Sequence, residues 1–307
     1  KEKGTHLLED CYKAYVKEWT DKFMQLHANE EELNRQFIDI YGLQDELTPD
    51  VPLDEITILQ QGEISIEENH LVWHPDVVMK QLISYIVGVW MGRYRLDRSG
   101  LYIAYPNPSA EELAPYTYHG QTVNIDDDAI IPLLPRDSPF EDNLVNRIVD
   151  FVRMVFGEET LTENLNFIEK QLGMSIEQYV LKDFWKDHKK MYHNRPIYWL
   201  FSSRKGAFQC LVYMHRMDAY TAERVRSKYL LPYMDWLLNR LHELEENAAN
   251  LSTVERREMD RITRQIAECR EYHDRLHVVA DRQEGFDLDD GVVVNYAKFG
   301  DVLAKLK

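Results

Sequence analysis

The chain has 307 residues, 44% of them apolar, and carries a formal net charge of −17. This apolar content supplies a real core, while the low counts of Gly (13) and Pro (11) argue against a β-sandwich, a β-barrel or long disordered stretches. Cys11, Cys210 and Cys269 are too scattered for a disulfide framework or a zinc site, and no apolar run reaches about 18 residues without a charge, so a cytoplasmic protein without a membrane span is expected.

Residues 1–94 are predicted to form a helical N-terminal part with a short β segment. Apolar residues repeat at helical spacing over 5–26 and predict a first helix. Asn29 and Glu32 have the spacing of a capping box, which predicts the start of a second helix, and Gly42 would end it as a C-cap glycine. Two successive helices are therefore expected before the first loop.

The rest of this part combines short β-like runs with a buried helix. Apolar runs within 56–73 predict a small hairpin that turns around Gln61-Gly62. A proline occupies the first turn of a predicted helix over 75–94. Gly88 and Gly92 have the spacing of a membrane dimer motif, but charged and polar residues nearby favour a buried helix with two small residues at a close crossing.

The composition changes over residues 95–138, where Gly, Pro and Asp dominate. This range is predicted to be an irregular acidic linker or insertion with a strand or two, and its run Asp126-Asp127-Asp128 is interpreted as a solvated loop. Helical spacing returns in 139–220, which is predicted to be a helical plus β-hairpin core. Its helices are expected at 139–156, 161–171 and 175–191.

The segment NRPIYWLFSSRKGAFQCLVYMHR (194–216) combines aromatic and basic residues. IYWLF is typical of a strand, SSRKG of a turn, and AFQCLVYMH of a second strand or a helix start. We expect an apolar hairpin whose aromatic side chains belong to the core and whose tip carries Arg204 and Lys205. A surface for a polyanion and a solvated rim both remain open for the flanking cations.

Residues 221–283 are predicted to form an antiparallel helical hairpin. The apolar row of the first helix has a spacing near 3.5 to 4 residues, and Ser252 with Glu255 predicts the cap of the second helix. Residues 284–307 are predicted to add a C-terminal strand, over the VVVNY run, and a helix. The expected fold is thus mainly α with a small β component, a helical domain with a long antiparallel coiled-coil hairpin.

Positive charge is concentrated in residues 189–228 of this acidic chain. The forty residues contain two acids, Asp218 and Glu223, against nine basic residues. Because Lys and Arg neutralise phosphates and aromatic rings stack on bases, these nine are the candidate DNA-binding residues. They are Lys189, Lys190, Arg195, Arg204, Lys205, Arg216, Arg224, Arg226 and Lys228.

No motif for catalysis, cofactor binding or metal binding is recognised. The sequence contains no Gly-x-Gly, so no glycine loop for a dinucleotide, a nucleoside triphosphate or a methyl donor is expected. His188 and His193 are five residues apart rather than four, which disfavours a shared metal on one helix face. The Asp-rich run at 287–290 is followed by Gly291 one position too early for a calcium loop.

Several stretches together resemble the PglX-type adenine-specific DNA methyltransferases of BREX phage-defence systems. They occur in the family's order and cover most of the chain: NEEELNRQFIDIYGLQDELTPDV (29–51), ISYIVGVWMGRYRLD (83–97), KDFWKDHKKMYHNRPIYWLFSSRKGAFQCLVYMHR (182–216), AERVRSKYLLP (222–232) and DLDDGVVVNYAKFGDVLAKLK (287–307). The chain begins with Lys1 and shows no signal peptide, so it is interpreted as a piece of a longer protein. The resemblance implies that this piece is the C-terminal region of such an enzyme.

This resemblance implies a parent enzyme that transfers a methyl group from S-adenosylmethionine to adenine in double-stranded DNA and works with other phage-defence proteins. The family's catalytic and cofactor motifs lie upstream, so the resemblance assigns no catalytic residue and no cofactor to this chain. We expect a non-catalytic domain that assists DNA binding. The alternative is a docking module for other components of the defence system, presented by the helical hairpin; an independent nuclease is disfavoured.

Overall fold

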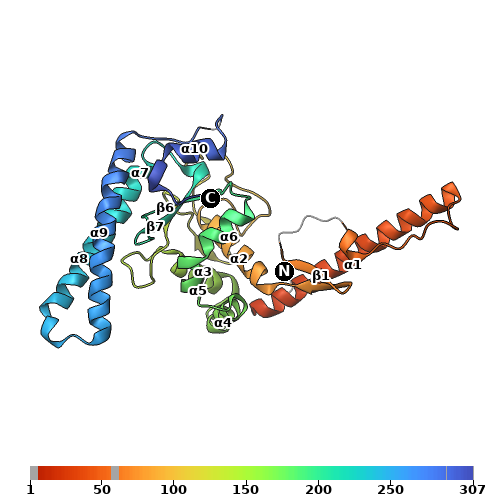
Figure 1. Ribbon diagram of the computed structural model, residues 1–307, viewed down its shortest axis with the longest axis horizontal. Helices are drawn as coiled ribbons and strands as arrows, with labels where there is room; N and C mark the ends of the chain where they lie inside the picture. The colour runs from red at the N-terminus through yellow and green to blue at the C-terminus, as the bar shows by residue number, and fades with distance from the viewer. Residues whose placement is uncertain (1–5, 57–61, 288, 307) are drawn as a thin grey trace. The chain divides into compact units, whose positions relative to one another are not determined.

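The computed structural model describes residues 6–56, 62–287 and 289–306. They divide into two compact units, unit 1 (Lys1–Leu82 and Val152–Met174) and unit 2 (Ile83–Phe151 and Ser175–Lys307). Helices dominate and the strands form small antiparallel sheets (Figure 1), which confirms the mainly α class with a small β component. The division of the chain into five sequence ranges stays a prediction.

Unit 1 is built on α1 (Leu8–Tyr41), one continuous helix of 34 residues. The predicted break at Asn29 is wrong, because its side chain accepts a hydrogen bond from Gln25 Nε2 at 2.9 Å within the helix instead of capping a new one. The three glutamates that follow are good helix formers and carry the helix through. Gly42 ends α1 in the left-handed region at φ 65°, as predicted.

A small hairpin packs on α1. It consists of β1 (Ile64–Glu67) and β2 (His70–Trp73), and it turns at Glu68 and Asn69, which both have positive φ. The predicted turn at Gln61-Gly62 is therefore wrong, and Gln61 itself lies outside the described residues. The apolar side chains beneath the hairpin form one cluster with α1 and with the short helix η1 (Leu53–Glu55): Phe23, Leu53, Ile56 and Ile64.

The N-terminus of α1 is held by α4 (Leu161–Leu172) within unit 1. The buried side chain of Asn164 accepts the backbone N–H of Leu8 at 2.7 Å and donates to the carbonyl of His6 at 2.9 Å. The N–H groups of a first helical turn have no partner within the helix, and Asn164 supplies one to Leu8. Two helices span the boundary between the units along the chain: α2 (Pro75–Trp90) and α3 (Leu144–Phe156).

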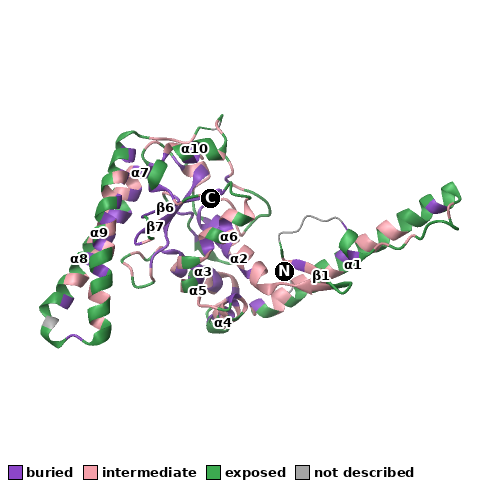
Figure 2. Cartoon of the chain, viewed as in Figure 1, coloured by how far each residue is buried: buried purple, intermediate pink, exposed green. Residues whose placement is uncertain are grey.

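The core of unit 2 is a three-stranded antiparallel sheet in the order β5-β7-β6. The predicted hairpin is confirmed as β6 (Tyr198–Ser202) and β7 (Gln209–Tyr213), with Tyr198 opposite Tyr213 and Ser202 opposite Gln209. The third strand, β5 (Ile130–Pro132), comes from the range interpreted as a linker or insertion. Every residue of β6 is buried (Figure 2), so the aromatic residues of this segment belong to the core as expected.

Several other elements of this unit are short. The strands β3 (Tyr116–Tyr118) and β4 (Gln121–Val123) pair with each other. The helix predicted over 175–191 divides at Asp183 into α5 (Ile176–Lys182) and α6 (Phe184–Met191). Among the residues that the structure describes, no helix is long and apolar enough to cross a membrane.

A long helical run follows the sheet. It contains α7 (Thr221–Arg224), a π-helical turn η3 (Val225–Leu230) and α8 (Leu231–Glu246). After the short η4 (Ala248–Asn250), α9 (Thr253–Asp281) returns beside α8 in the opposite direction (Figure 1). The predicted capping box is confirmed, because the side chains of Ser252 and Glu255 each bond the other's backbone N–H.

The C-terminal VVVNY run is helical and not a strand. It lies in α10 (Val292–Lys298), whose first turn is fixed by buried Asn295, since its amide donates to the carbonyls of Asp287 at 2.7 Å and Asp290 at 2.9 Å. These local bonds override the β-propensity of three valines. Strand-like pairing occurs later, where Leu303 bridges to Phe201 of β6 after the short η5 (Gly300–Val302).

Gly88 is buried in α2 and is closely approached by two tyrosine side chains, and a substitution can test this close packing. A Cβ at this position would lie 2.4 Å from Cδ2 of Tyr94 and 2.8 Å from Oη of Tyr198. We expect Gly88→Ala to lower the free energy of unfolding by about 2 kcal/mol through overpacking. Urea unfolding measures this, with Gly285→Ala as control because its nearest atom would be 3.8 Å away. Equal effects of the two substitutions would contradict the close packing at Gly88.

Candidate nucleic-acid interface

The turn between β6 and β7 presents Arg204 and Lys205, and both side chains are exposed. The turn is held from α9, where Glu268 Oε1 accepts the backbone N–H of Lys205 at 2.7 Å and that of Ala207 at 3.3 Å. Gly206 has a positive φ of 76°, which suits the tight turn. Among the described residues neither cation takes part in an ion pair, so a rigid backbone holds two free positive charges in water.

Three more cations lie at the opposite end of the hairpin. Lys190 and Arg195 are exposed, whereas Lys189 Nζ donates to the carbonyl of Lys305 at 3.0 Å and holds the end of the chain. A five-residue strand is about 17 Å long at 3.3 Å per residue. The candidates at the two ends therefore do not form one continuous patch.

The last four candidates are engaged within the chain. Each of their side chains has an acidic or carbonyl partner close by, and the partners are Asp126 O and Asp127 O for Arg216, Asp218 for Arg224, Glu223 for Arg226, and Asp128 for Lys228. Two of these partners are the only acids within 189–228; the others come from the loop before β5. Three of these four cations are thus paired with carboxylates, and Arg216 is bonded to two backbone carbonyls.

A cleft opens where this loop meets the helical run. Two adjoining hollows of about 370 and 540 Å³ share Asp127, Asp128 and Lys228 in their walls. The π-helical turn η3 supplies Lys228 and Tyr229, whose hydroxyl donates to Asp128 Oδ1 at 3.0 Å. Such turns are rare and are frequently found at functional sites. The walls carry both signs of charge, so the cleft does not select an anion by net charge.

Asp126 is buried beside the cleft, which corrects its interpretation as part of a solvated loop. Its carboxylate accepts Arg147 Nη2 at 2.8 Å and is 6% exposed, while Asp127 is exposed. Burial raises the pKa of Asp126 to about 6, outweighing the attraction of Arg147. Sequence reasoning missed this pair; the signal was the position of Asp126 between Ile125 and the apolar run that forms β5.

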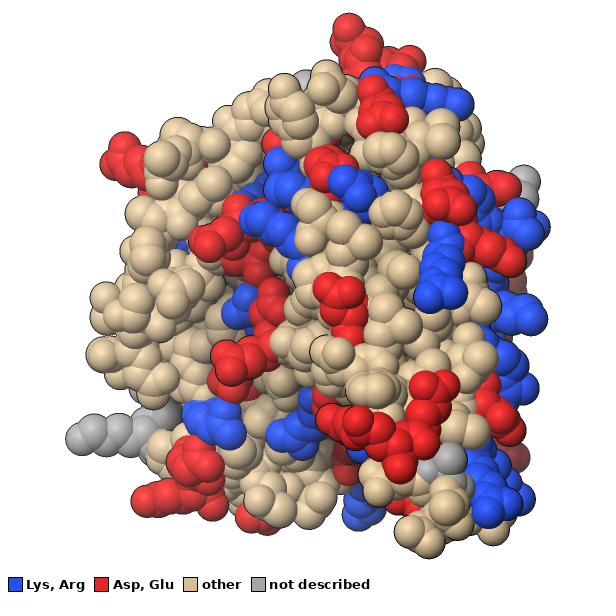
Figure 3. Space-filling model, turned by 90° about the vertical axis from the view of Figure 1, so that its left-hand side faces the viewer, with Lys and Arg blue, Asp and Glu red and all other residues tan. Residues whose placement is uncertain are grey.

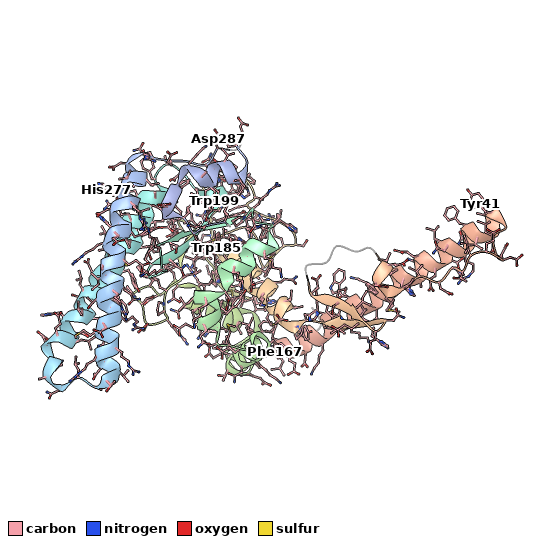
Figure 4. All side chains as sticks on the ribbon, viewed as in Figure 1. Tyr41, Phe167, Trp185, Trp199, His277 and Asp287 are labelled. Atoms are coloured by element: carbon pink, nitrogen blue, oxygen red, sulfur yellow. The ribbon has the colours of Figure 1, made fainter. Side chains whose placement is uncertain are left out.

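The residues considered for other chemistry have structural roles. His188 is buried, its Nε2 accepts the N–H of Tyr198 at 3.2 Å, and burial lowers its pKa to about 3. His193 is exposed. Asp287 lies in the turn before α10 (Figure 4), where its carboxylate accepts the N–H of Asp289 at 3.0 Å. Burial raises the pKa of the Cys210 thiol, so this cysteine is not an activated nucleophile.

The surface around the helical pair has mixed charge. Figure 3 looks onto the side that carries α8 and α9 and shows Lys and Arg interspersed with Asp and Glu. Ion pairs such as Arg240 Nε to Glu258 Oε1 at 3.0 Å tie the two helices together. This face has no large region of positive charge alone that would favour a polyanion. The exposed hairpin tip therefore remains the strongest candidate for a nucleic-acid contact.

Comparison with known proteins supports the resemblance seen in the sequence. No family model matches the chain. An adenine-specific methyltransferase BrxX of Escherichia coli O9:H4 (strain HS) is 39% identical over 96% of the chain, and an adenine-specific methyltransferase PglX of Lacticaseibacillus casei (strain Zhang) is 37% identical over 95%. The chain spans about a quarter of the length of these relatives (26% and 24%). It is homologous to one region of them.

The raised pKa of Asp126 predicts a pH dependence of stability. The folded protein holds this proton more tightly than the unfolded chain, so the stabilisation is present at low pH and is lost as pH rises through about 6. Relative to Asp126→Asn, the wild-type free energy of unfolding should fall by about 2 kcal/mol between about pH 4 and pH 7. Urea unfolding across this range tests it; a difference that is constant or rises with pH would contradict the assignment.

Proposed function

We propose that the chain is a non-catalytic region of an adenine-specific DNA methyltransferase of phage defence, and that it helps the enzyme hold double-stranded DNA. The observation that carries the proposal is the similarity to two adenine-specific methyltransferases across 95–96% of the chain. The methyl donor, S-adenosylmethionine, is proposed to bind the enzyme outside this chain. No described residue is assigned to catalysis.

The proposed DNA contact is the tip formed by Arg204 and Lys205. Both charges are exposed and unpaired, so a phosphate does not have to displace an existing ion pair. Their backbone is already fixed by Glu268, which lowers the ordering cost of binding. Lys190 and Arg195 are a proposed second contact, about five base pairs away if both ends face one duplex, because each base pair adds about 3.4 Å.

The other five candidates are proposed to be structural. Lys189, Arg216, Arg224, Arg226 and Lys228 already bond carbonyl or carboxylate groups of the chain. Bringing a phosphate to any of them would require a partner to be given up, and the carboxylates would remain nearby to repel it. The net charge of −17 also opposes DNA, so binding depends on a local cationic point.

The double substitution Arg204→Glu/Lys205→Glu tests the tip. We expect the affinity for a short labelled duplex to fall at least about tenfold and the slope of log affinity against log salt to shrink by about two, since two phosphate contacts are lost. The matched control is Arg256→Glu/Arg257→Glu on α9, which changes the same charge at two adjacent exposed positions. An equal loss in both variants would assign the effect to net charge.

A second candidate function is docking to another defence protein through α8 and α9. We propose that these helices form a coiled coil, as the apolar spacing predicts. The observation in its favour is exposed apolar surface on the pair, where Leu238, Val254 and Val278 are 37%, 73% and 51% exposed. This role is compatible with DNA binding because it uses a different surface.

Shortening the helical pair separates the two functions. The ion pair of Arg240 and Glu258 places these residues side by side, so a short Gly-Ser linker can replace residues 241–257 without removing Glu268. The replacement removes Val254 and keeps Leu238 and Val278, so docking at the end of the pair that carries Val254 predicts that co-purification with the other proteins of the defence system is lost while duplex binding by anisotropy is unchanged. Retained co-purification would count against the docking role.

A further inference from the structure

The C-terminal half of α1 carries an apolar stripe that no described residue buries. Leu33, Phe37, Ile40 and Tyr41 are 52%, 49%, 74% and 69% exposed, and their spacing places them on one face of the helix. The rings of Phe37 and Tyr41 stack at a centroid distance of 6.4 Å. Figure 2 shows this end of α1 largely exposed, and Figure 4 shows Tyr41 directed away from the ribbon. A contiguous apolar surface of this kind marks a contact site.

The chain covers a different face of this half-helix with its own backbone. After Gly42 the chain returns along α1, where the carbonyl of Val51 bonds His27 Nε2 at 2.7 Å and the N–H of Val51 donates to Glu31 Oε1 at 3.3 Å. Ile38 is buried on that side. A partner on the stripe therefore does not have to displace any of these contacts.

The stripe is surrounded by negative charge. Residues 29–55 contain nine acidic residues against one basic residue, Arg35, which is itself paired with Glu32. Glu30 lies one helical turn before the stripe, and Asp39 is the neighbour of Ile40. A net charge of −8 on this segment repels DNA, an anionic membrane surface and a second copy of the same segment. The charge selects a partner whose apolar groove is rimmed by Lys and Arg.

The size of the stripe favours a contact within one polypeptide. At these exposures the four side chains leave on the order of 500 Å² of accessible surface, since a large aromatic side chain alone accounts for about 150–250 Å². Docking would bury a similar area on the partner, about 1,000 Å² in total. Contacts between domains of one chain bury about 600–1,500 Å², whereas a standard interface between separate proteins buries about 1,600 Å².

Most of the proposed parent enzyme lies outside this chain. The chain spans about a quarter of the length of its relatives, so a methyltransferase of their length has the remaining three quarters available as a partner. An enzyme that holds DNA needs clusters of Lys and Arg, which is the charge that the acidic segment attracts. Connection through the backbone raises the effective concentration of two such surfaces to about the millimolar range, so a modest contact is sufficient.

We propose that the face of α1 formed by Leu33, Phe37, Ile40 and Tyr41 docks into an apolar groove, rimmed by Lys and Arg, on the part of the methyltransferase polypeptide that lies outside this chain. The inference rests on the proposed function, since it takes the chain to be a region of such an enzyme. The docking face belongs to unit 1, whereas the proposed DNA contact belongs to unit 2. Docking and DNA binding can therefore be tested separately.

Site-specific photocrosslinking in the full-length methyltransferase tests the proposal. A benzophenone amino acid replaces Ile40, and mass spectrometry identifies the peptides that it links. We expect links within one polypeptide, to a peptide outside this chain that has apolar residues beside Lys or Arg, at a yield that does not depend on enzyme concentration. Links only to this chain, to a second copy or to another protein, or no links at all, would overturn the proposal.

Val254 on α9 provides the matched control position. Ile40 and Val254 are 74% and 73% exposed, so the benzophenone group is equally accessible at both. In the purified enzyme, position 254 should give at least about tenfold fewer links to peptides outside this chain, because no tethered contact raises their local concentration. Equal yields from the two positions would mean that the links report random encounters, which would also overturn the docking.

Charge reversal tests the choice of a basic partner. Glu30→Lys/Asp39→Lys should lower the yield of links from position 40 by at least about threefold, because attraction to the rim becomes repulsion. The control Asp260→Lys/Asp274→Lys changes two exposed acids of α9 and should leave the yield unchanged. Circular dichroism verifies that α1 stays helical. An unchanged yield in the first variant would exclude a partner rimmed by Lys and Arg.

Duplex binding by the same enzymes distinguishes this inference from the proposed function. Fluorescence anisotropy with a labelled duplex measures DNA binding independently of the links. Duplex binding without links from position 40 would refute the docking alone. Links from position 40 without duplex binding would refute the DNA-holding role alone.

Discussion

The β6-β7 hairpin of unit 2 is buried along its strands, and this burial determines which neighbouring charges remain available to a ligand. Trp199 on β6 contacts Tyr296 and Phe299 at ring-centroid distances of 5.0 and 5.8 Å, and Phe208 contacts Tyr272 at 5.9 Å. The strands are shielded from solvent, so only the two ends of the hairpin are accessible. A turn whose backbone is anchored by Glu268 then holds two cations at a fixed place, and no ion pair to either side chain is seen among the described residues.

Charge in this chain has to be counted in space rather than along the sequence. Residues 189–228 are strongly basic as a segment, yet the loop before β5 brings the Asp128 carboxylate to Lys228 and the backbone carbonyls of Asp126 and Asp127 to Arg216. A buried or half-buried cation needs such partners, because desolvation of an unpaired charge is costly. The same rule leaves the unpaired cations at exposed turns, where water solvates them and where a phosphate has access.

The sequence predicted the features that depend on local chemistry. The C-cap at Gly42, the capping box at Ser252 and the strand-turn-strand pattern of the hairpin needed no knowledge of distant residues. Prediction from the sequence failed where contacts with distant residues, or competing local contacts, determine the structure. Helix α1 continues through Asn29 because the side-chain amide of Asn29 bonds that of Gln25. The valines of α10 are helical because Asn295 fixes the turn before them. Asp126 is buried because Arg147 forms an ion pair with its carboxylate.

The most direct test of the DNA-holding role is the salt dependence of binding of a short labelled duplex by the wild-type chain, measured by fluorescence anisotropy. Neutralisation of two to four phosphates predicts that log affinity falls linearly with log salt, with a slope of about −2 to −4. Absence of binding at low salt, or an affinity that salt does not change, would contradict the role and leave the chain as a protein-docking region.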